Sequence, residues 1–499
     1  MQDLNLSKFH SFFIYNSTFS KSEETETDKI IFYYPETTTL KEQLQNVGLI
    51  EALTAYSLSF SNKKCNSLHL EKNRYVFFEP EKDYWLVLII SNPFTYKMKG
   101  NEKIQKFKFN LLSDQTLLQI LKNSYRIFYM FYQTFNDLVQ KNSVLYLKSI
   151  LAQFFPFYLS NIDFSYSSIE NTVWTALDGI QFCSVHKNLY LRIKCLMNQV
   201  KSNFPYVKNS MLLFEKNLVW SSFETEETRN LYHFMCSQVL GQYKSTKSKE
   251  FGKEKPTVKL ENKESTVFSY QNLILGIQNL VADIKEEHFL TGATLIENKV
   301  VIKIPTIFVS ESNTQKYQLI IYKSRNLFLL LFLENEAPNL NEISFYQKLS
   351  TLIRKEMQSI CELLNNGQDE DEKIDQVFNY IYFNSINLSV KQCLNEKRNF
   401  SLTDVIPQLV AVSDELLRKK SQIPDEIDNP KTQYLRFIIE REIPFEIISQ
   451  SKKSVWIVGK KTSNHVFFLI FDQKNVNLNS IEEEMEKFSS ALFKDYFFD

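Results

Sequence analysis

Several features that would place this chain of 499 residues in a broad functional class are absent from it. Lysine plus arginine equals aspartate plus glutamate, at 58 each, so no excess of positive charge favours binding of nucleic acid by the whole chain. The longest apolar run, LFLLLFL at 327–333, is far shorter than the ~20 residues that span a bilayer. The N-terminus, MQDLNLSKFHSFFIYN, lacks the basic start and apolar core of a secretory signal. We therefore predict a soluble cytoplasmic protein whose membrane association is peripheral.

The cysteines show no paired spacing. The chain has six, at Cys65, Cys183, Cys195, Cys236, Cys361 and Cys393. Scattered in this way, they predict free thiols in a reducing compartment and not a disulfide framework. Cys183 and His186 have the CxxH spacing of half a zinc site, but no second ligand pair follows at zinc-finger distance. We predict no metal site.

Motifs of nucleotide and covalent chemistry are also missing. A phosphate-binding loop needs glycines at fixed offsets, and the chain has only nine glycines in all. The nearest candidate, VGKKTS at 458–463, has Ser454 in place of the first glycine and Lys461 in place of the residue that would bind magnesium. No GxSxG nucleophile elbow and no HExxH metalloprotease motif is present. We predict no catalytic residue and no cofactor.

What the chain does contain is one order of predicted elements, repeated three times. Each copy reads as two strands, a helix, three strands, and one or two helices. In the first copy these are strands at 9–17 and 29–35, a helix over about 40–60, strands at 67–80, 84–93 and 104–112, a helix from Ser113 to about 140, and a helix at 143–160. The second copy has its first hairpin at 210–223 and single strands at FLTGATL and VVIKIPTIFV. The third has its hairpin at 378–392 and a closing helix at 480–497.

This order predicts an α+β fold of three tandem longin domains. In each, a five-stranded antiparallel sheet is flanked by helices. We expect the domains at 1–165, 166–366 and 376–499. Residues 244–266 interrupt the second domain with seven lysines, four glutamates and almost no apolar side chain. This segment is either a disordered insertion or a basic strap for anionic lipid.

Aromatic residues interleaved with lysine occur at QKFKFN (105–110) and NRYVFF (73–78). Such a pattern is found on surfaces that bind single-stranded nucleic acid. Alternation with a period of two explains it equally well as a half-buried strand. Given the zero net charge, we predict no nucleic-acid binding.

Several stretches in order resemble one family. They are FFIYN, KIIFYYP, QNVGLIEAL, SLHLEKNR, FFEPEKDYW, FLTG, IPTIFV, IYFNSINLS, WIVGKK and QKNVNLNSIEEE, with FKDYFFD at the end. The chain resembles the Ccz family (calcium, caffeine and zinc sensitivity) from about residue 9 to its C-terminus. The likeness fails chiefly at 244–288, 365–375 and 421–443.

The resemblance implies a subunit that pairs with a Mon-like longin protein. Together they would act as a guanine nucleotide exchange factor for the late-endosomal or vacuolar Rab GTPase, promoting fusion with the vacuole or lysosome. The first longin domains of both subunits would face the Rab, and the other domains would hold the heterodimer and face the membrane. Exchange by preferential binding of the nucleotide-free conformer needs no covalent catalyst.

The predicted helix at 40–60 has two apolar stripes, where a surface helix needs one. One contains Leu49, Leu53, Tyr56 and Phe60, and the other contains Leu40, Leu44, Val47 and Leu58. Glu51 lies beside the second stripe, which favours the first stripe as the core face. The other stripe would then meet the partner or the Rab, unless a kink at Gly48 or a start near Asn46 lets both serve one core. The contact candidates are Gln45, Asn46, Gly48, Leu49, Glu51 and Ala52.

Lysines bracket the predicted strand SVWIV of the third domain. Lys452, Lys453, Lys460 and Lys461 are candidate contacts with anionic lipid, or simply solvated strand ends. Two further functions remain open. One is a longin exchange factor for another Rab, of the Hermansky–Pudlak type. The other is a longin tether or adaptor without exchange activity.

Overall fold

The computed structural model describes most of the chain. The described residues are 5–366 except 21–22, 62–64, 100–101, 109–112, 163, 165–174, 242–269, 282–286, 297–298, 313 and 336, together with 379–393, 409–413, 415, 445–450, 456–462, 464–471, 483 and 485–488. The segments predicted as insertions, 244–266 and 421–443, lie outside them.

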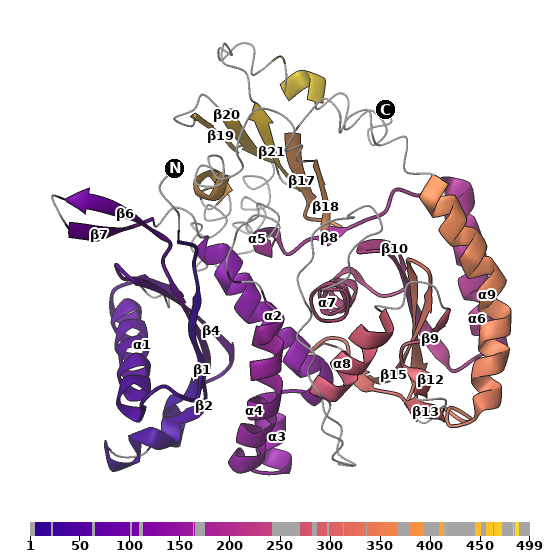
Figure 1. Ribbon diagram of the computed structural model, residues 1–499, viewed down its shortest axis with the longest axis horizontal. Coiled ribbons are helices and arrows are strands. Elements are labelled where there is room, and N and C mark those ends of the chain that lie inside the picture. The colour runs from indigo at the N-terminus through magenta and orange to yellow at the C-terminus, as the bar shows by residue number, and fades with distance from the viewer. Residues whose placement is uncertain are drawn as a thin grey trace, which may run out of the picture. The chain divides into compact units, whose positions relative to one another are not determined.

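The first sheet has five antiparallel strands in the order β2-β1-β5-β4-β3. Its strands are β1 (Phe9–Asn16), β2 (Ile30–Tyr34), β3 (Ser67–His69), β4 (Asn73–Glu81) and β5 (Tyr84–Ser91). The central strands β1 and β5 are almost fully buried, and α1 packs on one face of the sheet (Figure 1). The predicted strand at 67–80 is two strands here, separated by a short turn at 70–72.

The second sheet repeats this order as β10-β9-β16-β15-β11. Its strands are β9 (Val207–Phe214), β10 (Asn217–Ser221), β11 (His288–Phe289), β15 (Lys316–Ser324) and β16 (Leu327–Glu334). A further strand, β14 (Thr306–Phe308), pairs with β15 beyond β11. Between β11 and β14 the chain forms a separate hairpin of β12 (Gly292–Ile296) and β13 (Lys299–Lys303). The prediction of a single strand at VVIKIPTIFV is therefore wrong. The segment divides at Pro305, which has no N–H group to donate to the hydrogen-bond ladder of a sheet.

The third sheet has the same five-strand plan, with one additional strand. Its strands are β17 (Asn379–Asn384), β18 (Ser389–Cys393), β19 (Phe445–Gln450), β20 (Trp456–Lys461) and β21 (His465–Phe471). The order is β19-β20-β21-β17-β18, and β8 (Ile180–Gln181) adds to the free edge of β18 in parallel. Leu177, at the end of the short helix α5 (Thr175–Leu177), packs into the core of this sheet. A segment that precedes the second sheet in sequence thus completes the third.

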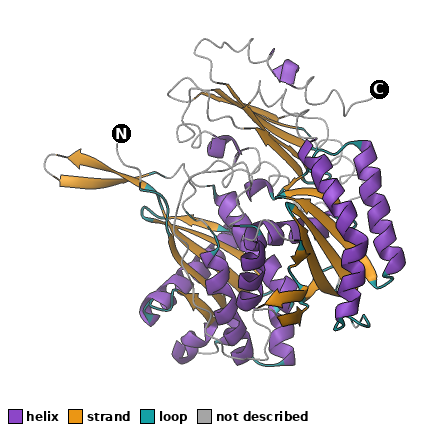
Figure 2. Cartoon of the chain, turned by 45° about the vertical axis from the view of Figure 1, so that its right-hand side comes forward, coloured by secondary structure: helices purple, strands orange, loops and turns teal. Residues whose placement is uncertain are grey.

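Helices flank the sheets, as Figure 2 shows by colour. They are α1 (Leu40–Ser61), α2 (Asp114–Tyr132), α3 (Phe135–Lys141), α4 (Val144–Ser160), α6 (Lys187–Asn203), α7 (Thr225–Phe234), α8 (Tyr270–Val281) and α9 (Ile343–Asn366). One helix was predicted from Ser113 to about residue 140. It is interrupted because Gln133 has a left-handed φ of 70° and Thr134 caps α3.

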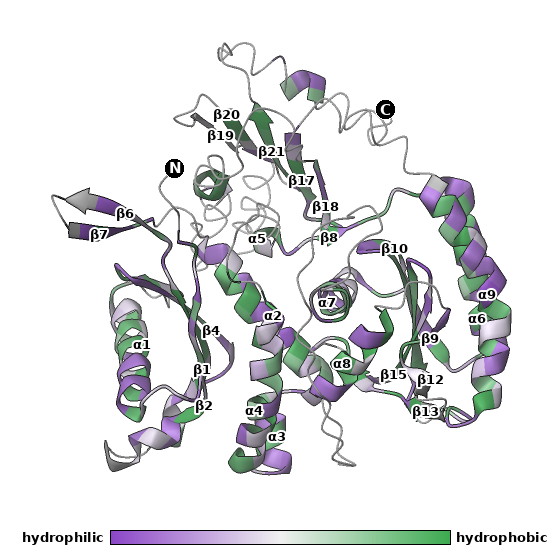
Figure 3. Cartoon of the chain, in the orientation of Figure 1, coloured by the Kyte–Doolittle hydropathy of each residue, from purple (hydrophilic) through white to green (hydrophobic). Residues whose placement is uncertain are grey.

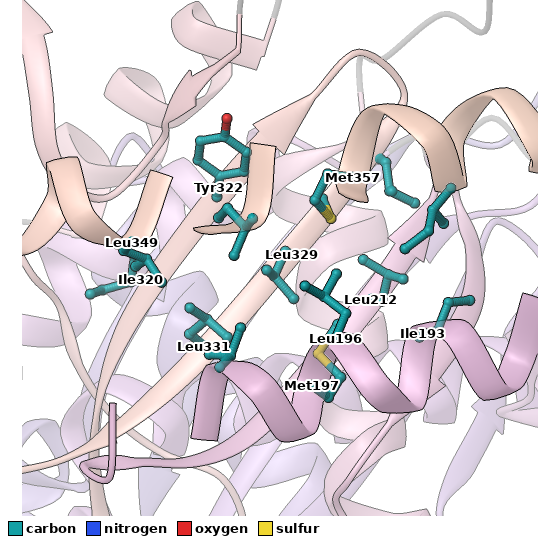
Figure 4. Packing of buried hydrophobic residues seen from close by; sticks show 14 of the residues in the cluster. Ile193, Leu196, Met197, Leu212, Ile320, Tyr322, Leu329, Leu331, Leu349 and Met357 are labelled. Atoms are coloured by element: carbon teal, nitrogen blue, oxygen red, sulfur yellow. The ribbon is translucent and has the colours of Figure 1, made fainter. Parts of the chain in front are cut away.

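The second sheet has the largest core cluster. Helices α6 and α9 pack on one face, and Figure 4 shows Leu196 and Met197 of α6 and Met357 of α9 against Leu329 of β16. Figure 1 places α7 and α8 on the opposite side of that sheet. A continuous apolar strand such as β16 is expected when both faces of a sheet are covered.

The chain forms two compact units. One contains residues 1–123, 163–182 and 368–499, and the other contains 124–162 and 183–367. Helices α3 and α4 and the end of α2 therefore belong to the unit of the second sheet. Phe131 of α2 contacts Phe234 of α7 and Tyr270 of α8 at ring-centroid distances of 5.4 and 5.0 Å. Burial raises the pKa of Tyr270 well above its usual value, so its hydroxyl stays neutral and donates to Gln238.

Candidate interaction surface on helix α1

Helix α1 is the element on which the sequence placed its contact candidates. It runs from Leu40 to Ser61 as one helix, so it does not begin near Asn46. Its core stripe consists of Val47 and Ile50, which are fully buried, and Leu44 and Leu53, which are half-buried against the first sheet. Of the predicted core stripe of Leu49, Leu53, Tyr56 and Phe60, only Leu53 packs on the sheet, and the prediction is wrong for Leu49, Tyr56 and Phe60. They lie on the opposite side of the helix.

Asn46 was predicted to be exposed, and it is buried. Its side-chain amide donates to the Tyr33 hydroxyl at 2.9 Å and accepts from the Tyr75 hydroxyl at 3.3 Å. Burial raises the pKa of both tyrosines, so both hydroxyls keep their protons at neutral pH. Because the amide satisfies polar groups inside the core, Asn46 holds α1 to β2 and β4 and is not a surface residue.

Glu51 is half-buried and already has a partner within the chain. Its carboxylate lies 2.9 Å from the Lys29 ammonium group, immediately before β2. This ion pair connects the middle of α1 to the segment that enters the first sheet. Glu51 is thus committed to an internal contact, and its replacement by lysine would place two ammonium groups together.

The remaining candidates do share one exposed face. We call it the α1 outer face: Gln45, Gly48, Leu49, Ala52, Tyr56 and Phe60. These positions follow helical spacing and lie opposite Val47 and Ile50. Tyr56 and Phe60 are 64% and 76% exposed, and their rings lie 4.6 Å apart. Figure 3 shows hydrophobic and hydrophilic residues interspersed along α1, as expected for a helix with two apolar stripes.

Gly48 leaves this face open. A Cβ atom at Gly48 would meet nothing within 4 Å, so packing within the chain does not require glycine there. Gly48 gives the outer face a shallow backbone surface between Gln45 and Ala52. The cost of glycine within a helix is about 0.5–1 kcal/mol relative to alanine.

Of the four lysines proposed for lipid contact, the structure describes two. Lys460 and Lys461 are half-buried near the end of β20, an inner strand between β19 and β21. Lys452 and Lys453 lie outside the described residues.

A cluster of polar side chains at Asp114 went unnoticed in the sequence. The Asp114 carboxylate accepts from Ser67 at 2.9 Å and Arg74 at 3.1 Å and lies 2.8 Å from the His69 ring. Ser67 donates to the carboxylate and not to the imidazole, so the cluster is not arranged as a nucleophile and its base. It fastens the start of α2 to β3 and β4. No sequence spacing indicated it, because the four residues come from three separate elements.

Neither a metal site nor a membrane span emerges from the part of the chain that the structure describes. Within it, no three His, Cys, Asp or Glu side chains gather in a group able to hold a metal ion. None of the described helices is long and apolar enough to cross a bilayer.

Comparisons with known proteins agree with the three-sheet architecture. The profile of the first longin domain of INTU, CCZ1 and HPS4 matches residues 9–133. Those of Intu longin-like domains 2 and 3 match 207–354 and 375–488. The vacuolar fusion protein CCZ1 homologues of Xenopus laevis and Nematostella vectensis are each 28% identical to this chain. The alignments cover 98% of the chain and 96% and 97% of those proteins.

The homologue of Dictyostelium discoideum is 26% identical, over 98% of both chains. The expected fold of three longin domains is thereby confirmed, and so is the resemblance to the Ccz family. The similarity extends through all three domains and is not confined to one. The chain thus contains three longin-like domains and is similar over nearly its whole length to the vacuolar fusion protein CCZ1 homologues.

Proposed function

We propose that this chain is one subunit of a heterodimeric guanine nucleotide exchange factor for the late-endosomal or vacuolar Rab GTPase. The similarity to vacuolar fusion protein CCZ1 homologues over 98% of the chain carries this proposal. The partner would be a Mon-like longin subunit. The complex would promote fusion with the vacuole or lysosome after peripheral recruitment to the late-endosomal membrane.

The α1 outer face is the surface that we assign to this partnership. Tyr56 and Phe60 supply large aromatic anchors, and such residues dominate the binding energy of protein interfaces. Gly48 and Ala52 present little side chain, so a partner can approach the helix backbone closely. Gln45 adds a polar group at the start of the face. Asn46 and Glu51, which have internal partners, do not belong to the contact set.

Exchange on such a surface works by selective binding. A GTPase without nucleotide has a different arrangement of its switch segments from one that holds GDP. A complex that binds the empty arrangement more tightly shifts the population toward it. The differential affinity sets the size of that shift, and no residue of this chain needs to form a covalent bond.

The first experiment is nucleotide release from the late-endosomal Rab of the same organism, measured with a fluorescent GDP analogue. Three preparations are compared: this chain, its Mon-like partner, and the co-expressed pair. Acceleration by the pair alone supports the proposal. If the pair forms but release does not accelerate, the chain is a tether or adaptor. If no pair forms, the partner assignment is wrong.

A second experiment tests the surface. Tyr56→Ser combined with Phe60→Ser removes both aromatic anchors from an exposed position, so the fold of the first domain should be kept. We expect weaker pairing with the partner or slower nucleotide release. Ile386→Ser, at a turn residue that is 65% exposed, is the matched control for loss of an exposed apolar side chain. Equal effects of the two changes would remove α1 from the interface.

A further inference from the structure

A lysine-rich hairpin extends from the first domain between β5 and α2. Strands β6 (Phe94–Lys99) and β7 (Glu102–Phe107) pair with each other as a two-stranded sheet, and within the described part of the chain they join no larger sheet. At its base, Asn5 and Phe94 exchange two backbone hydrogen bonds of 2.9 and 3.0 Å, and the Phe94 and Phe107 rings lie 5.7 Å apart. Figure 1 shows the hairpin reaching away from the first sheet. It was predicted from sequence as a single strand of that sheet, at 104–112.

The hairpin carries a concentrated positive charge. Residues 94–108 contain five lysines and one glutamate, in a protein whose net charge is zero. Lys97 and Lys106, on opposite strands, are exposed, as are Lys103 and Lys108. Directly opposed residues of an antiparallel pair share a face, so Lys97 with Ile104 lie on one face and Tyr96 with Gln105 on the other. Lysine and apolar side chains are therefore mixed on the ribbon.

Tyr96 and Ile104 are each 43% exposed. The alternation of aromatic residues with lysine at 105–110 was interpreted from sequence as a half-buried strand, but of the residues described there Gln105, Lys106 and Lys108 are exposed and Phe107 is half-buried. An isolated two-stranded hairpin is at best marginally stable in water, which favours a second surface that packs on it.

We propose that the β6–β7 hairpin contacts an anionic lipid bilayer. Four net positive charges complement a negative leaflet, where each basic side chain strengthens binding by about fivefold. Ile104 shares a face with Lys97 and Lys106 and adds an apolar side chain that the acyl boundary can accept. This site is separate from the third-domain lysines considered above.

The basic side chains of this surface suit a lipid surface better than a protein interface. All five basic residues of 94–108 are lysine. Lysine is depleted at protein interfaces, where arginine and its fixed pattern of donors are enriched. A strongly hydrated point charge on a flexible stem suits a fluid surface that offers no fixed geometry. The inference extends the peripheral membrane recruitment in the proposed function, but it does not depend on exchange activity.

The test is sedimentation of the full chain with vesicles, with no GTPase present. Vesicles of phosphatidylcholine alone are compared with vesicles that also contain phosphatidylserine. We expect binding to the anionic vesicles only, and a loss of about 25-fold or more in Lys97→Glu combined with Lys106→Glu. Lys348→Glu combined with Lys355→Glu, on exposed positions of α9, makes the same change in total charge. We expect it to keep most of the binding.

Three results would overturn the proposal. The first is equal loss in both double variants, which would reflect total charge alone. The second is unchanged binding in the hairpin variant. The third is that the chain does not bind vesicles but binds a single-stranded oligonucleotide, and that the hairpin variant loses this binding. That result would assign the hairpin to nucleic acid. Because Ile104→Ser leaves the charge intact, a partial loss of vesicle binding in that variant separates the apolar contribution from the electrostatic one. A failed exchange assay would leave all of these outcomes unaffected.

Discussion

Removing the Asp114 carboxylate should open the first domain where α2 meets the edge of the first sheet. In Asp114→Ala, Ser67, His69 and Arg74 all lose their shared acceptor. The Arg74 side chain is 2% exposed and that of Asp114 is 12% exposed, so solvent screens this ion pair little. Loss of one member of a buried pair costs about 3–5 kcal/mol. We expect the lower end, about 3 kcal/mol, because water reaches part of the carboxylate.

Hydrogen–deuterium exchange measures this effect locally. Unfolding of a chain with several domains is not two-state, so a global free energy of unfolding would be ill defined. Every 1.4 kcal/mol changes the equilibrium constant for local opening by tenfold. We therefore expect about 100-fold faster exchange for the amides that exchange by local opening of β3, β4 and the first turns of α2. Glu362→Ala breaks the exposed Arg325–Glu362 pair, whose side chains are 52% and 62% exposed, and is the control. Its effect should stay below about 1 kcal/mol.

The double variant Arg74→Met with Asp114→Leu tests whether the loss in Asp114→Ala comes from the buried, uncompensated charge of Arg74 or from the lost hydrogen-bond network. It removes both charges and keeps apolar volume, so most of the lost protection should return. Exchange in the double variant as fast as in Asp114→Ala would refute the reasoning. The interaction would then be a hydrogen-bond network that needs both partners, and not a buried charge that needs compensation.

Three further changes test other parts of the fold. A Cβ at Gly179 would clash with the Val390 side chain, so Gly179→Val should cost about 1–3 kcal/mol and increase hydrogen exchange in β17 and β18. Unchanged exchange there would show that the contact of this segment with β18 is dispensable. Leu329→Ala leaves a cavity in the core of the second sheet and should lower the free energy of local unfolding by about 2–5 kcal/mol, which is measured as faster hydrogen exchange in β15 and β16. Protection from exchange equal to that of the parent chain would mean that the core refills the space. Burial lowers the pKa of His465, whose ring lies against Tyr382, so the unfolded chain binds more protons below the ordinary value of 6.5. The third domain should therefore lose stability as the pH falls below about 6.5, and thermal scans at pH 7 and 5 should show a smaller loss in His465→Gln; an equal loss would assign the pH effect elsewhere.

Much of the fold follows from periodicity along the chain. The strands at 9–17, 29–35 and 84–93 and the hairpin at 210–223 were located from runs of apolar and β-branched residues, and the structure has them as β1, β2, β5, β9 and β10. Ser113 was expected as the N-cap of α2, and its hydroxyl accepts from the Thr116 amide at 3.4 Å. These features depend on residues that are close in sequence, so local patterns report them.

Breaks within elements were harder to predict. Gln133, in a left-handed conformation, ends α2 although the apolar spacing of that segment continues toward Phe135. The strand expected at 104–112 instead forms β7 of a separate hairpin, because β3 already pairs with β4 at that edge of the sheet. A pattern of period two predicts a strand but does not specify which strand it pairs with.

Sequence alone determined the fold class, the threefold repetition and the resemblance to the Ccz family, because each is encoded in the order and spacing of motifs along the chain. Only the tertiary structure decided which stripe of α1 is buried, where the Asp114 cluster forms, and that β8 completes the third sheet. Leu44 and Leu49 are equally apolar, and helical spacing places each on a defined stripe. The facing residues Tyr33 and Tyr75, with the Asn46 amide between them, determine which stripe enters the core. Such contacts join residues far apart in sequence, so no local pattern contains them.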